Sequence, residues 1–148
     1  DELWRILRTS PGMVERVDSL TRLNRTVGVG QMMITHTVSD FTALAHEADQ
    51  RKAQGFIERS KMLFIGGVPK KEIEELRRVF TFSDAEQQLV SSWNAPGTYD
   101  PTTGARTAPV GRGKFLLKTS YAPGFPFHMR FVKSEYALSD TNRRWEMK

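Results

Sequence analysis

The sequence opens with two adjacent carboxylates, Asp1 and Glu2. Tandem acids directly after a buried strand can support Mg²⁺ through one carboxylate and orient an attacking water with the next, as in phosphate-ester hydrolysis by nucleotide-dependent motors. An acidic start with no initiator methionine leads us to expect that the chain begins inside a domain.

A second polar group follows the apolar run that starts at Val29 and ends in Thr35, His36 and Thr37, with Asp40 next before a helical pattern. An apolar run that ends in polar side chains and feeds a helix is typical of a buried strand in an α/β sheet. In such sheets the chemistry gathers at the carboxyl ends of the strands. We therefore expect Thr35 and His36 to belong to a site at that edge.

Several common sites are excluded by their spacing. The sequence has no Gly-x-x-x-x-Gly-Lys-Ser/Thr phosphate loop, because Ala108 stands at the first glycine position before Gly113-Lys114 and Phe115 at the hydroxyl position. The three histidines, His36, His46 and His128, do not make a metal-binding spacing. No nucleophile-elbow motif supports a hydrolase triad.

Composition bounds the class of protein. The chain has 148 residues, enough for about one domain, and no Cys, so disulfide frameworks and zinc–thiolate sites are excluded. No apolar run approaches the roughly 18 residues of a membrane span. The net charge is +5. Because the basic residues lie among acids, an ordinary solvated surface is favoured over a face that contacts nucleic acid.

Helical spacing of apolar residues predicts helices near residues 1–7, over 13–27 and over 41–59. Val68-Pro69 predicts the start of another helix, with Ile73, Leu76, Val79 and Phe80 on its apolar face. The pattern Ser83-Asp-Ala-Glu86 is a capping box for a further helix that continues to Trp93.

Strands are predicted over 29–35, 61–65, 113–119 and 125–132, with Met32, Met33 and Met62–Ile65 as core. Residues 94–112 form a long polar loop, and the tail from Ser134 to Trp145 starts as a helix. Alternating strands and helices predict a mainly parallel sheet flanked by helices, with an antiparallel edge pair near the C-terminus. We treat residues 1–148 as a single partial domain.

In order along the chain, these motifs resemble the C-terminal part of the ATPase core of type IV secretion and conjugation systems. Those TraC-like ATPases belong to the HerA/FtsK-like P-loop superfamily. The matching motifs are Asp1-Glu2-Leu-Trp4, Arg22-Leu-Asn-Arg25, Met33-Ile-Thr35-His36 with Ser39-Asp40, Ser60–Phe64, Phe82–Glu86, Gly113–Leu117, and Glu135–Trp145 with Asp140-Thr-Asn142. The sequence departs from the family at His36, where Gln is usual, and it lacks the Walker A half of the site.

The resemblance implies the C-terminal half of a RecA-like domain in a hexameric, Mg²⁺-dependent ATPase at the cytoplasmic face of the membrane. Its partners would be other secretion or conjugation components and DNA. Asp1 would support Mg²⁺, and Asp1 and Glu2 would bind the nucleotide, with Glu2 as catalytic carboxylate. Thr35 and His36 would sense phosphate or position water, and Arg22 or Arg25 would reach a phosphate across a subunit interface. This part alone is not expected to hydrolyse ATP.

Two alternatives stay open. One is a DNA-translocating motor of the same superfamily, whose phosphate contacts would make binding fall steeply with salt. The other is a non-enzymatic α/β interaction module in which the acidic pair has no role. Such a module would fold by itself and melt cooperatively.

Overall fold

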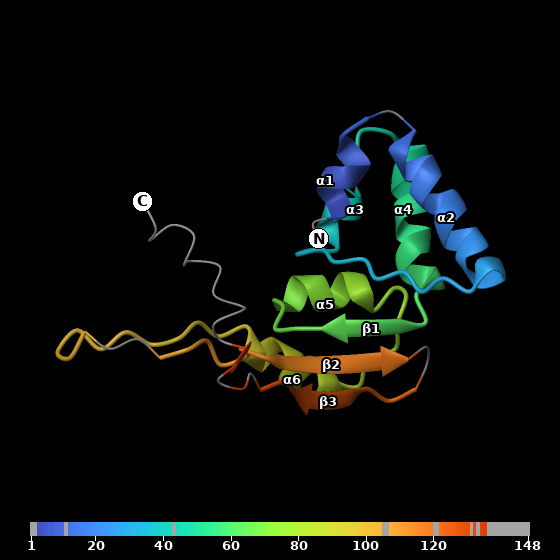
Figure 1. Ribbon diagram of the computed structural model, residues 1–148. Helices are drawn as coiled ribbons and strands as arrows, with labels where there is room; N and C mark the ends of the chain where they lie inside the picture. The colour runs from blue at the N-terminus through green and yellow to red at the C-terminus, as the bar shows by residue number, and fades with distance from the viewer. Residues whose placement is uncertain are drawn as a thin grey trace.

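The computed structural model describes residues 3–10, 12–42, 44–104, 107–119, 122–130, 132 and 134–135. Within these residues the fold is mixed α/β. In Figure 1, helices α1 to α4 lie together at one end of the body, and a small sheet with α5 and α6 lies at the other. Asp1 and Glu2 lie outside the described residues, as does the tail after residue 135.

The N-terminal helices are α1 (Leu3–Arg8), α2 (Met13–Val27), the short α3 (Ser39–Thr42) and α4 (Glu47–Arg59). Gly28 ends α2 in a left-handed conformation, at φ 67°, and its N–H donates to Asn24 O. The apolar stripe of α2 places Val14 and Val17 in one hydrophobic core with Phe56 of α4. The prediction for α2 is confirmed, but the helix expected over 41–59 is two helices, of which the second begins at Glu47.

The sheet has three strands, β1 (Met62–Ile65), β2 (Lys114–Thr119) and β3 (Phe125–His128), in the order β1-β2-β3. Both pairings are antiparallel, with Phe64 opposite Leu117 and Phe115 opposite Phe127. The antiparallel pair near the C-terminus is confirmed. The predicted mainly parallel sheet is wrong for the described residues, because the chain turns back through residues 94–112 and returns to β1 in the opposite direction.

The strand predicted over 29–35 is also wrong. These residues form no regular secondary structure and pair with no described strand, and Val29, Met32 and Ile34 are 53%, 77% and 47% exposed. Met32 is therefore not core, whereas Met33 is partly buried against the core. In the run from 62 to 65, Ile65 is buried while Met62 and Phe64 are exposed, because alternate residues of a strand face opposite sides.

Helices α5 (Lys70–Leu76) and α6 (Asp84–Trp93) follow β1. The capping box is confirmed: the Ser83 Oγ accepts from the Glu86 N–H, and the Glu86 carboxylate accepts from the Ser83 N–H. Val90 and Trp93 of α6 are buried in the same core as Leu116 of β2. Helix α5 ends at Leu76, earlier than predicted, yet Phe80 still enters the core through the turn that follows.

Beyond α6, the described residues of 94–112 form irregular structure, as predicted, and this segment extends away from the body in Figure 1. The Thr98 and Thr107 hydroxyl groups lie 2.8 Å apart and tie its two arms together. Within the described part of the chain, no helix combines the length and apolarity needed to cross a membrane.

Candidate functional site

One backbone hydrogen bond joins the two segments in which the sequence predicts site residues. The N–H of Leu3, the residue after Glu2, donates to the carbonyl of Ile34, the residue before Thr35, over 2.9 Å. Leu3 is buried in the core, which fixes the start of α1 against this segment. The described chain therefore holds the neighbours of Glu2 and Thr35 side by side, although Asp1 and Glu2 lie outside the described residues.

The polar loop 35–40 is ordered by its own hydroxyl and carboxylate groups. The Thr35 Oγ1 donates to Asp40 Oδ2 over 3.2 Å, and the Asp40 N–H donates to Thr37 Oγ1, also over 3.2 Å. The Thr37 hydroxyl thus satisfies an N–H group at the start of α3 that has no partner within the helix. Thr35 and Thr37 are half-buried, whereas His36 is exposed. A molecule that reached this loop would meet hydroxyl groups and an imidazole.

Glu72 of α5 holds this loop by accepting two hydrogen bonds from it. Its Oε2 accepts from the Val38 N–H over 2.7 Å, and its Oε1 accepts from the Ser39 Oγ over 3.1 Å. The residue is only 7% exposed, so both carboxylate oxygens accept these hydrogen bonds inside the protein. Sequence reasoning missed Glu72 because acidic residues are usually at the surface. The available signal was its spacing, four residues before Leu76 on the apolar face of α5.

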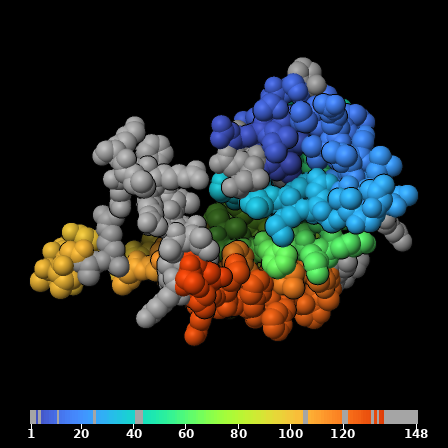
Figure 2. Space-filling view, in the orientation of Figure 1, coloured from blue at the N-terminus to red at the C-terminus, as the bar shows by residue number. Residues whose placement is uncertain are grey.

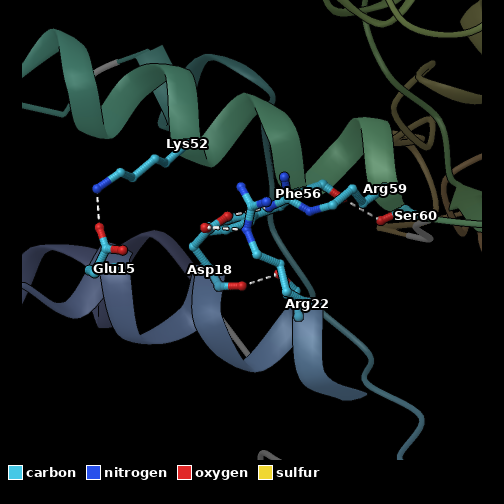
Figure 3. Close-up of polar contacts among 8 residues, drawn as sticks. Glu15, Asp18, Arg22, Lys52, Phe56, Arg59 and Ser60 are labelled. Atoms are coloured by element: carbon cyan, nitrogen blue, oxygen red, sulfur yellow. Dashed lines mark hydrogen bonds and ion pairs between the residues drawn. The ribbon is translucent and has the colours of Figure 1, made fainter. Parts of the chain in front are cut away.

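The predicted arginines lie on α2, away from the hydrogen bonds of this loop. The Arg22 Nε donates to Asp18 Oδ2 over 2.8 Å, and Arg59 of α4 pairs with Asp18 Oδ1. Figure 3 shows both guanidinium groups directed toward the carboxylate of Asp18. None of these contacts involves residues 35–40, so the structure does not bring Arg22 to the loop. The side chain of Arg25 lies outside what the structure describes.

Opposing effects set the pKa of Asp18. Burial raises the pKa, but the hydrogen bond from Arg22 and the positive charges of Arg59 and Arg22 outweigh it, so the pKa lies below its ordinary value. Asp18 is therefore a buried anion that holds α2 against α4, and the exposed Lys52–Glu15 pair joins the same two helices.

The described residues contain no cluster of three His, Cys, Asp or Glu side chains that could hold a metal ion. Asp40 and Glu72 already accept hydrogen bonds from the loop itself. A shallow pocket of 270 Å³ between α5 and α6 contains none of the predicted site residues, and Lys70, Arg77, Glu74 and Asp84 give it mixed charge.

The chain matches no protein-family description, no curated protein and no solved structure.

Proposed function

We propose that this chain is the C-terminal part of an ATP-hydrolysing motor that energises transfer of protein or DNA through a type IV secretion or conjugation apparatus. The observation that carries the proposal is the hydrogen bond from Leu3 to Ile34. A P-loop motor needs its magnesium-supporting acid and its phosphate-sensing group at neighbouring strand ends. That bond brings the residue after Asp1-Glu2 next to the residue before Thr35-His36, which supports a site shared by the two pairs.

The exposure of residues 29–34 supports the same proposal. Val29, Met32 and Ile34 belong to an apolar segment that no described strand accompanies. An exposed apolar segment of this kind often marks a surface that packs against another part of a protein or against a partner. In the proposed longer protein, other parts of the protein would pack against this exposed apolar segment and cover it.

In this proposal ATP and Mg²⁺ are the cofactors and a hexamer is the working assembly. The resemblance assigns Mg²⁺ to Asp1, the catalytic carboxylate to Glu2, and phosphate sensing to Thr35 and His36. Arg22 could reach a neighbouring subunit only if it exchanged its contact with Asp18 for the phosphate, since the two side chains are paired in this chain.

The test uses the longer protein that contains this chain. Glu2→Gln should lower ATP turnover by about 10²–10⁴-fold, the contribution typical of a positioned acid or base, while nucleotide binding stays unchanged. His36→Ala should also lower turnover, and His36→Gln should preserve it, since Gln is the usual residue of the family. Exposed His46, which makes no side-chain cap at the start of α4, provides the matched control His46→Ala. Normal turnover by the Glu2→Gln protein would refute the proposal.

A further inference from the structure

One face of the sheet is apolar and open to solvent. Because side chains alternate along a strand, Ile65, Leu116 and buried Lys118 face the core and α6, and the opposite set faces outward. We call this second set the aromatic face: Met62, Phe64, Phe115, Leu117, Phe125 and Phe127. Met62, Phe64 and Phe125 are 58%, 53% and 66% exposed. Figure 2 shows the strands side by side on the side of the molecule turned to the viewer.

Three phenylalanine rings span the aromatic face from β1 to β3. The Phe115 and Phe127 rings are stacked, with centroids 5.7 Å apart and planes inclined by 27°. The Phe64 ring meets the Phe127 ring edge-on, with centroids 6.1 Å apart and planes at 84°. Each strand thus contributes one ring to a continuous aromatic surface, on which Phe64 is exposed and Phe115 and Phe127 are half-buried. Exposed aromatic rings on a sheet are platforms on which unpaired bases stack.

The two stretches of sequence that supply the strands carry only basic charges, although buried Lys118 is paired with Glu86 of α6 on the opposite face of the sheet. All three strands come from two stretches of sequence, 61–71 and 101–134. These contain nine of the 22 Lys and Arg residues, three in the first and six in the second, and none of the 17 Asp and Glu residues. The rest of the chain carries 13 basic against 17 acidic residues. Lys61, Arg112 and Arg130 are exposed near the strand ends, so the aromatic face has a basic border.

We propose that the aromatic face binds single-stranded nucleic acid. Bases stack on Phe64, Phe115 and Phe127, and the backbone phosphates are attracted by the basic residues at the ends of the strands. The apolar surface alone would also suit a protein partner, but the absence of any acidic residue from both stretches favours a polyanion. Duplex DNA fits less well, because its bases are already stacked on one another. The inference uses no residue of loop 35–40, so it stands independently of the proposed ATPase.

The experiment measures fluorescence anisotropy of a labelled 20-nucleotide oligothymidylate with the full 148-residue chain. Phe64→Leu and Phe127→Leu keep an apolar side chain but remove the ring, so Kd should rise about fivefold to a hundredfold for each. Phe127→Trp should bind at least as tightly as the wild type. Leu23→Ala, on α2 and 58% exposed in the wild type, is the matched control and should bind unchanged. Circular dichroism spectra of all variants verify that each is folded.

Two further measurements need no variant. The affinity of the wild-type chain should fall steeply as salt rises, with a slope of about 0.7 in log Kd against log salt for each phosphate contacted. A duplex of the same length should bind more weakly. The proposal is overturned if the Leu variants bind as the wild type does, or if binding ignores salt. It is equally overturned if sedimentation shows that the aromatic face joins two copies of the chain and the oligonucleotide does not bind.

Discussion

Glu86 lies at the centre of a buried polar contact that should dominate the stability of the sheet half of the protein. Its Oε1 accepts from the Lys118 Nζ over 2.9 Å and from the Gly124 N–H, and its Oε2 accepts from the Ser83 N–H over 2.7 Å. Lys118 is 1% exposed, and its Nζ lies 5.1 Å from the centre of the Phe82 ring. Glu86 therefore joins α6, β2 and the turn before β3.

The substitution Glu86→Gln keeps the shape and can still cap α6, but it leaves the Lys118 ammonium buried without a counter-charge. Burial raises the pKa of Glu86, but hydrogen bonds from Ser83, Lys118 and Gly124 lower it by more. The net effect is a fall in the pKa from 4.5 to about 2. A pKa difference of this size corresponds to about 3 kcal/mol of stabilisation. Breaking a buried pair by removing one partner typically costs about 3–5 kcal/mol. We therefore expect a loss of about 3 kcal/mol at pH 7.

The assay is thermal unfolding followed by circular dichroism at 222 nm, repeated with urea. For a chain of this length the expected fall in Tm is roughly 6–12 °C. The pH dependence gives a second readout. Because folding lowers the pKa of Glu86, its stabilisation is fully present above the unfolded value of 4.5 and is lost as pH falls toward about 2. The wild type should lose stability over this window, and the Glu86→Gln protein should lose about 3 kcal/mol less.

Two controls separate the buried charge from a general effect of the substitution. Glu15→Gln removes the same charge from the exposed pair with Lys52 and should change Tm far less. The double variant Glu86→Gln/Lys118→Met removes both charges and should recover most of the lost stability, because no unpaired charge stays buried. If Glu86→Gln unfolds within about 0.5 kcal/mol of the wild type, the reasoning is refuted.

Two other predictions concern the helical end and the polar loop. Asp18→Asn should destabilise the protein by about 1–3 kcal/mol at pH 7, because Arg22 and Arg59 lose their shared anion, and urea unfolding would measure it. An unchanged urea midpoint would contradict the role given to Asp18. Glu72→Ala should speed amide hydrogen exchange at Val38 roughly tenfold or more, whereas exposed Glu74→Ala on the same helix should not. Equal exchange in both variants would show that Glu72 does not hold the loop.

The elements that the sequence predicts correctly are those with local signals. Helix α2 follows from its apolar spacing, and the start of α6 follows from the capping box at Ser83. The pair β2 and β3 follows from two short apolar runs around the Pro123-Gly124 turn. In each case the residues that decide the structure are near neighbours in the chain, so their spacing suffices.

The candidate site was predictable in part. Thr35 and Asp40 stood out as polar groups at the end of an apolar run, and the structure joins them by a hydrogen bond. Glu72 could not be identified with the site, because its contacts with Val38 and Ser39 span more than 30 residues of sequence. The contact of Arg22 with Asp18, in contrast, could be predicted from the sequence, because the two residues are four apart on one helix.

The sequence by itself determined the composition, the local helices and turns, and the stretches that lack acidic residues. Only the tertiary structure decided which strands pair. An apolar run specifies burial but not its partner, so the run from Val29 could not be distinguished from a true strand, and the direction of β1 relative to β2 could not be known. The aromatic face has the same origin. Phe64 and Phe127 are distant in sequence, and the antiparallel order β1-β2-β3 alone makes them neighbours on one surface.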